Sequence, residues 1–183
     1  SEHGVLQKRH RIIIVGWKIN RSGSDIPTTY NYPTLEKEDM PYSIMKDLFC
    51  DLPERKAGEG ELCGIVEYTK PLEEMEYLRK TAIRGVLNFT TQHIARPTND
   101  NDREIYRQAV LMCKRLNYAK LDPALQKHKN KESFCNRFCV VDPNGVCHTV
   151  VAHIAMDGHY YIYPNETPTL ENVRSITIRE AAR

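Results

Sequence analysis

Short apolar runs alternate with polar, turn-rich stretches along the whole chain, and their lengths are typical of strands and helices. Six runs rich in β-branched or aromatic residues predict strands. These runs cover residues 11–17, 62–68, 134–141, 146–154, 159–163 and 173–178. Apolar residues at helical spacing follow Pro71 and recur from Ile105 to Leu116, which predicts two amphipathic helices. This mixture predicts an α/β fold, with α+β as the alternative, in a single domain spanning residues 1–183.

Capping signals indicate where the two helices begin. Thr69 stands just before Pro71, a pairing typical of a helix cap followed by a first turn that accepts proline. Gly85 weakens the far end of this helix, which we expect to reach toward residue 87. Residues 97–102 form a polar break whose Asn and Asp side chains can cap the second helix.

The segments between these elements carry turn and loop signals. Asp142-Pro143-Asn144-Gly145 predicts a hairpin turn. Residues 19–42 predict a long loop, and loops of that length often have a function. Residues 45–49 predict a short strand or turn, and residues 164–183 a loop, the last short strand and a polar tail.

Composition narrows the function classes. The 183 residues carry 26 basic and 24 acidic side chains, a net charge of +2, which is too balanced for a non-specific nucleic-acid binder. The chain shows neither a membrane-length apolar run nor a visible secretion signal. Its six cysteines do not form a recognisable disulfide framework, which favours a reducing compartment.

The histidines and cysteines of the sequence suggest two kinds of functional site. One is a zinc site, although the cysteine spacing matches no standard zinc motif, so packed strand cysteines are the preferred interpretation. Its candidate ligands are Cys135, Cys139, Cys147, His148, His153 and His159. The other is a thiol nucleophile formed by Cys113 and His93, which nothing in the sequence pairs. We therefore expect no catalytic residues, no metal and no cofactor.

Residues 67–72 and 108–116 carry a resemblance to a known family. Glu67-Tyr68-Thr69-Lys70-Pro71-Leu72 resembles the Glu-Tyr-Ala-Thr-Pro-Leu segment that ends a strand in the ligand-binding domain of STING, the stimulator of interferon genes. The segment from Gln108 to Leu116 resembles that family's Gln-Ala-x-Leu-x-Cys helix. Order and spacing agree over residues 5–142, whereas residues 146–183 have no counterpart.

The resemblance implies a receptor and not an enzyme. It implies a central mixed sheet flanked by helices, a lid hairpin, and a homodimer that binds a cyclic dinucleotide such as cGAMP or c-di-GMP in its cleft. Expected partners are this ligand and a downstream signalling protein, without long nucleic acid. Innate immune signalling would then proceed by conformational change and oligomerisation, at the cytosolic face of the endoplasmic reticulum membrane.

Five residues are the expected ligand contacts. The resemblance places Glu67, Lys70 and Tyr42 at the cyclic dinucleotide, with Thr69 beside them. A carboxylate such as that of Glu67 can accept hydrogen bonds from a base edge or a ribose hydroxyl. We expect Lys37 or Lys70 to supply positive charge for the phosphates.

Two rival functions stay open from the sequence. A protein-interaction domain without a small ligand would use the turn at residues 142–145 and the strand edge at residues 159–163. A cyclic-nucleotide phosphodiesterase would use histidines as acid and base.

Overall fold

The computed structural model describes residues 4–9, 12, 14, 41–112, 116–128, 137–150 and 158–183. These residues form short helices and strands, which confirms a mixed α/β class. The predicted loop at residues 19–42, including Lys37, lies almost wholly outside the described residues. Within the predicted strand at residues 11–17 the structure describes Ile12 and Ile14, and both side chains are about nine-tenths exposed, so they are not the buried strand residues that we expected.

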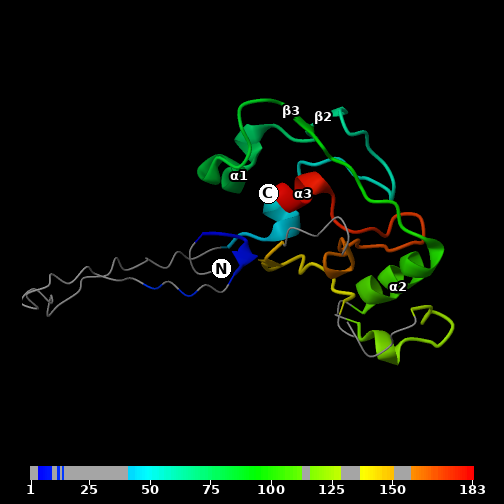
Figure 1. Cartoon of the computed structure of the whole chain (residues 1–183). Coiled ribbons are helices and arrows are strands. Elements are labelled where there is room, and N and C mark those ends of the chain that lie inside the picture. The colour runs from blue at the N-terminus through cyan, green and yellow to red at the C-terminus, as the bar shows by residue number, and fades with distance from the viewer. Residues whose placement is uncertain are drawn as a thin grey trace, which may run out of the picture.

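Two small strand pairs are present in the described part of the chain. Strand β1 (Gln7–Lys8) pairs in parallel with β4 (Cys147–His148), and β2 (Ile65–Glu67) pairs antiparallel with β3 (Phe89–Thr91). The sequence predicted one central mixed sheet, whereas these pairs are separate sheets. Figure 1 shows the β2–β3 pair at one end of the molecule, away from helix α2 (Asp100–Leu111).

The region after β2 departs from the single helix that was predicted from Pro71. The chain makes one 3-10 turn, η2 (Leu72–Glu74), and then helix α1 (Glu76–Thr81). Ala82 adopts a left-handed conformation, with φ 54°, and its backbone N–H bonds to Arg79. A left-handed residue closes a helix by satisfying its last carbonyls, so the helix ends before Gly85. Residues 45–49 lie mainly in a π-helical turn, η1 (Ile44–Leu48), and not in a strand.

Helix α2 begins within the polar break at residues 97–102, as predicted, but it ends at Leu111 and does not reach Leu116. The Asn99 side chain accepts a hydrogen bond from the backbone N–H of Asp102 at 2.9 Å, so an asparagine caps the helix. The helix buries an apolar stripe against residues from the later half of the chain. This stripe consists of Ile105, Tyr106, Ala109 and Val110.

The described residues form two hydrophobic cores, one around α2 and one around η1 and α1. Three extended segments connect them. Val140 bridges in parallel to Ile162, which bridges antiparallel to Ser175. Ile162 packs in the core around α2, whereas its neighbour Tyr161 packs in the core around η1 and α1. Because side chains alternate across an extended segment, one set of segments covers both cores. The described residues also contain two further 3-10 turns, η3 (Tyr118–Lys120) and η4 (Gly158–Tyr160).

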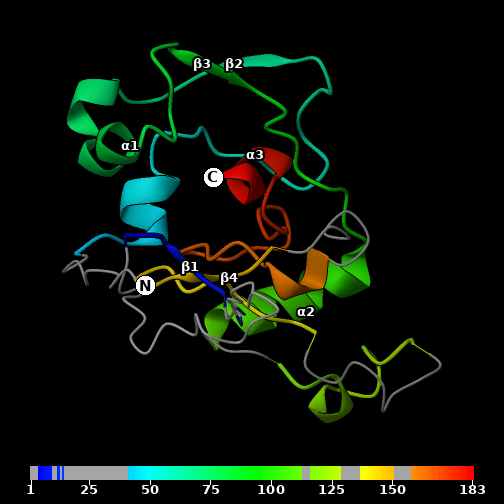
Figure 2. The same cartoon turned by 60° about the vertical axis from the view of Figure 1, so that its left-hand side comes forward.

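Helix α3 (Ile178–Ala182) was not predicted from the sequence. Figures 1 and 2 both show α3 near the centre of the molecule, beneath the β2–β3 pair. The backbone N–H of Ile178 bonds to the carbonyl of Ile94, and the Arg179 side chain donates to the Thr91 carbonyl at 2.9 Å. The segment predicted as a polar tail therefore lies against the middle of the chain.

Candidate functional site

A buried ion pair holds the start of α3. Both nitrogens of the Arg174 guanidinium end donate to the Glu180 carboxylate, at 2.7 and 2.8 Å, and each side chain is only 2% exposed. The Arg174 Nε donates to the Arg55 carbonyl at 2.9 Å. Such a pair is stable inside a protein only because its remaining hydrogen-bonding groups are also satisfied. The ion pair thus ties residues near position 55 to the last helix.

Thr177 and Glu180 cap α3 reciprocally. The backbone N–H of Glu180 donates to Thr177 Oγ1 at 3.1 Å, and the backbone N–H of Thr177 donates to the Glu180 carboxylate at 2.6 Å. This is a capping box, in which two unpaired helix N–H groups are satisfied at once. The Thr-x-x-Glu spacing was visible in the sequence, so it was the signal that could have predicted α3.

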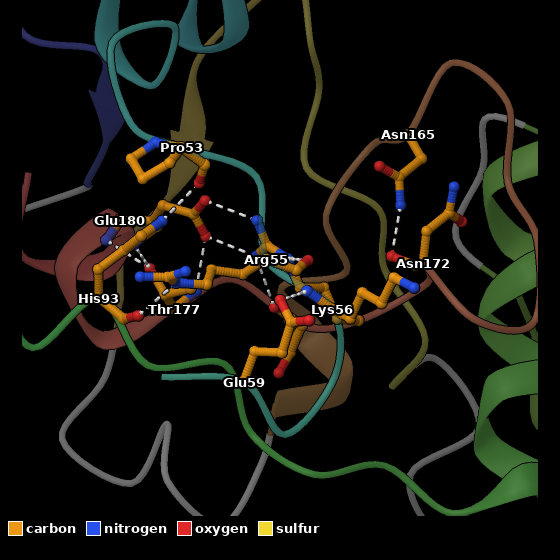
Figure 3. Close-up of polar contacts among 11 residues, drawn as sticks. Pro53, Arg55, Lys56, Glu59, His93, Asn165, Asn172, Thr177 and Glu180 are labelled. Atoms are coloured by element: carbon orange, nitrogen blue, oxygen red, sulfur yellow. Dashed lines mark hydrogen bonds and ion pairs between the residues drawn. The ribbon is translucent and has the colours of Figure 1, made fainter. Parts of the chain in front are cut away.

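His93 joins this network at both ring nitrogens. Its Nε2 lies 2.7 Å from the Pro53 carbonyl, which can only accept, and its Nδ1 lies 3.0 Å from Thr177 Oγ1. Figure 3 shows His93 between Pro53 and Thr177, with Glu180 beside them. Burial, the largest cause, lowers the pKa of His93. The neutral ring therefore donates a hydrogen bond from Nε2 to the Pro53 carbonyl and accepts a hydrogen bond from the Thr177 hydroxyl at Nδ1.

A polar cavity of about 510 Å³ adjoins this network. Its rim carries Arg55, Lys56 and Glu59 on one side and the loop containing Asn165 and Asn172 on the other (Figure 3). Asn165 donates to the Asn172 carbonyl at 2.8 Å, which fixes the loop across its base. Charges of both signs line this cavity, so it is equipped to hydrogen-bond a polar group.

A second buried charge cluster lies at the end of β2. The carboxylate of Asp51 accepts hydrogen bonds from both Arg84 and Arg183, so two positive charges share one negative charge. Both guanidinium groups also lie over the Tyr68 ring, 3.8 and 5.3 Å from its centroid. Cations are attracted to the face of an aromatic ring. This arrangement leaves the cluster with an excess of positive charge.

The exposed turn at Thr69 and Lys70 lies directly over this cluster. The backbone N–H of Thr69 donates to the Asp51 carbonyl at 2.8 Å, and the Lys70 carbonyl accepts from Arg84 at 2.7 Å. Both residues are exposed to solvent, as is Glu67 on β2. The structure thus places three of the five predicted ligand residues close together at the end of β2.

The other two predicted ligand residues are placed differently. Tyr42 lies against α1, where its hydroxyl donates to Glu76 at 2.7 Å and its ring centroid lies 5.1 Å from that of Tyr77. Lys37 lies outside the described residues. Whether any of the five contacts a ligand stays a prediction.

The described cysteines and histidines form neither the zinc site nor the thiol nucleophile that the sequence left open as alternatives. Burial raises the pKa of the Cys50 thiol. Burial, and after it the charge of the nearby Cys139, raises the pKa of the Cys147 thiol to about 11. Both shifts disfavour the reactive thiolate. Both ring nitrogens of His93 are engaged, and Cys113 lies outside the described residues. Among the residues described, none of the histidine, cysteine and carboxylate side chains group as a metal site, while Cys135 and His153 are not described.

The chain resembles one curated enzyme over its full length. It is 34% identical to the type II methyltransferase M.Bpa9945I of Bacillus paralicheniformis, over 193 aligned positions that cover all of this chain. The chain spans 40% of the length of that relative. No protein-family profile matches the chain, and no solved structure matches it.

This relative overturns the resemblance to STING. Similarity along all 183 residues outweighs two short segments, and it includes residues 146–183, which the STING resemblance left without a counterpart. The predicted innate immune receptor for cGAMP or another cyclic dinucleotide is therefore wrong, as are its homodimer and its signalling partner. The phosphodiesterase alternative is unsupported, and the prediction that the chain does not belong to an enzyme is also wrong.

The predicted location at the endoplasmic reticulum membrane depended on the same resemblance and is wrong with it. In the described part of the chain, no helix is long and apolar enough to cross a membrane. The prediction that no cofactor binds remains a prediction.

Proposed function

We propose that this chain is part of a DNA methyltransferase. The observation that carries the proposal is the 34% identity to a type II methyltransferase along the whole chain. DNA as the substrate contradicts the expectation that no long nucleic acid binds, which followed from the resemblance to STING. A net charge of +2 argues against a uniformly basic surface, but DNA contact needs only local clusters of cations.

We propose that the chain contributes to holding DNA, and that the turn at Thr69 and Lys70 contacts its phosphates. Lys70 is exposed, and the two arginines around Asp51 add positive charge beneath it. Phosphate contacts of this kind position a protein on DNA without reading its sequence.

We also propose that residues 1–183 fold as one unit of this enzyme. Its support is a set of contacts between segments far apart in sequence, including Thr149 donating to the Lys8 carbonyl at 3.0 Å and Arg174 donating to that of Arg55 at 2.9 Å.

A chimaeric enzyme tests the function. The matching 40% of the Bacillus paralicheniformis relative would be replaced by this chain, and transfer of a labelled methyl group from S-adenosylmethionine to plasmid DNA would be measured. We expect methylated DNA from the chimaera. A chimaera that folds but leaves DNA unmethylated, while the parent enzyme methylates it, would contradict the proposal.

Within the chimaera, Lys70→Ala tests the phosphate contact. We expect weaker DNA binding and a salt dependence shallower by about one phosphate contact. Lys120→Ala is the matched control, because Lys120 is also an exposed lysine in a short turn. Equal effects of the two substitutions would remove Lys70 from the proposed surface.

A further inference from the structure

The outward face of the β2–β3 pair presents apolar side chains to solvent. Exposure alternates along both strands, and the register places the exposed Ile65 and Glu67 on the same face as the half-buried Phe89. The opposite face carries Thr90, which is 4% exposed, so that face lies toward the rest of the chain. Figures 1 and 2 both show α3 beneath the pair. Ile65, at 68% exposed, therefore projects away from the described part of the chain.

Exposed apolar residues extend this face beyond both ends of the pair. Leu62 lies just before β2, Val86 and Leu87 lie just before β3, and all three side chains are exposed. The Tyr68 N–H donates to the Asn88 carbonyl at 2.9 Å, so the chain that leads into β3 continues alongside the end of β2. Single exposed apolar residues are ordinary on a protein surface. A row of them along one strand pair indicates an interaction surface.

Charged side chains are sparse on this face. Residues 62–66 and 85–91 carry no charge, although 27% of the whole chain is charged, and Glu67 is the acid that follows the first stretch. Arg84, just before the second stretch, is buried and paired with Asp51. The water-facing side of an antiparallel sheet is ordinarily polar, whereas the centre of a protein interface is depleted of charged residues. The face thus has the composition of an interface.

Strand β2 also has an open backbone edge within the described residues, where β3 is its single partner strand. Tyr68 lies opposite Asn88 and bonds to it, and hydrogen-bonded positions alternate along an antiparallel pair. The backbone groups of Ile65 and Glu67 therefore point away from β3. An edge of this kind, beside apolar side chains, is ordinarily covered by another segment of protein.

The methyltransferase relative extends well beyond the part that this chain matches. The chain spans 40% of its length, so the rest of that enzyme is a further body of protein. The turn at Thr69 and Lys70, the proposed DNA contact, lies at the end of β2 and is continuous with the apolar face. Because the parts of one enzyme act on the same DNA, the rest of the enzyme also lies near this turn. The apolar face is the adjoining surface that it can cover.

We propose that the outward face of the β2–β3 pair docks the rest of the methyltransferase, the part that has no counterpart in this chain. Ile65, Leu87 and Phe89 supply the apolar contacts, and the open edge of β2 offers its backbone groups. The surface that docks there is itself apolar and carries few charges. This inference rests on the proposed function, because the occupant is taken from the relative, and it locates an interface that the function alone does not locate.

Thiol labelling in the chimaeric enzyme tests this interface. Leu87→Cys and Leu111→Cys are a matched pair, because the two leucines are 57% and 58% exposed and Leu111 ends α2, away from the β2–β3 pair (Figure 1). Mass spectrometry would locate the labelled cysteine in the isolated chain and in the chimaera. In the isolated chain we expect both introduced thiols to react at similar rates. In the chimaera, Leu87→Cys should react about tenfold more slowly or less, because labelling then requires the interface to open, whereas Leu111→Cys should react as before.

Two further measurements use the same proteins. Native Cys63, which is exposed and lies just before β2, should be protected in the chimaera in the same way as Leu87→Cys. Ile65→Thr keeps a β-branched residue in the strand and removes apolar surface. We expect it to lower the thermal midpoint of the chimaera and to leave that of the isolated chain unchanged, because Ile65 is exposed there.

Equal labelling of Leu87→Cys in the isolated chain and in the chimaera would overturn the proposal. Protection in the isolated chain that grows with protein concentration would also overturn it, because the occupant would then be a second copy of the chain. Protection in a chimaera that leaves DNA unmethylated supports the interface and counts against the proposed function. Methylation without protection does the reverse, so the two failures are distinguishable.

Discussion

His93 is a buried histidine whose folded environment requires the neutral ring. Burial lowers its pKa below the ordinary value, so the folded chain releases this proton more readily than the unfolded chain. Its contribution to stability is therefore complete above the unfolded pKa of about 6.5 and is lost as the pH falls from there toward the lowered folded value. The loss has a ceiling of about 1.4 kcal/mol for each pH unit in that window.

We predict that wild-type stability, measured by urea unfolding between pH 7.5 and pH 5, falls more steeply with acid than that of His93→Gln. His148→Gln is the matched control, because His148 is exposed on β4. A slope in His93→Gln as steep as that of the wild type would show that His93 does not cause the acid loss.

A second prediction at the scale of residues concerns the buried ion pair between Arg174 and Glu180. Glu180→Ala leaves the Arg174 charge buried without its partner, so we expect a loss of about 3–5 kcal/mol in the free energy of unfolding. Glu171 is paired to Lys56 at 3.6 Å on the surface, with its side chain 81% exposed. Glu171→Ala should stay within about 0.5 kcal/mol of the wild type. Similar losses in the two variants, measured by urea unfolding, would contradict the assignment.

At the scale of elements, Thr177 couples a helix cap to the buried histidine. Thr177→Ala removes the Oγ1 that caps α3 and also the hydroxyl that faces His93 Nδ1. We expect a loss of about 1–2 kcal/mol, larger than that of Asn99→Ala, which removes only the exposed cap of α2. Thr177→Ser keeps both hydrogen bonds and should recover most of the stability. If thermal unfolding shows that Thr177→Ser loses as much stability as Thr177→Ala, the lost stability is due to the methyl group and not to the hydroxyl.

Elements with local signals were predictable from the sequence. Asn99 caps α2 within the predicted polar break. The backbone N–H of Asn144 bonds to the Asp142 side chain in the predicted turn, but the predicted hairpin is wrong, because the following strand β4 pairs with β1. Elements that depend on distant contacts were not predictable in the same way. Helix α3 carries a local capping signal in Thr177 and Glu180, but the contact of Thr177 with His93, 84 positions away, could not be predicted from the sequence. The candidate site follows the same rule, because the neighbours of Lys70 could be predicted along the chain but its position over Arg84 and Asp51 could not.

At the scale of the whole molecule, the alternation of side chains along the extended segments decides how the chain unfolds. Ile162 and Val173 pack in the core around α2, whereas Tyr161 and Ile176 pack in the core around η1 and α1. Because the same short segments contribute to both cores, one core cannot open without displacing side chains of the other. The two cores should therefore unfold together as one cooperative unit.

Ile162→Ala tests this coupling, because the fully buried Ile162 side chain belongs to the core around α2 only. We expect a loss of about 2–5 kcal/mol in the free energy of unfolding. Native-state hydrogen exchange should report the same loss for amides of α2 and for amides of η1, although η1 contacts the other core. Leu170→Ala, at a half-exposed leucine, should leave the hydrogen exchange of the amides of α2 and of η1 unchanged. A loss confined to α2 would mean that the cores open separately, and the proposal that residues 1–183 fold as one unit would then be wrong.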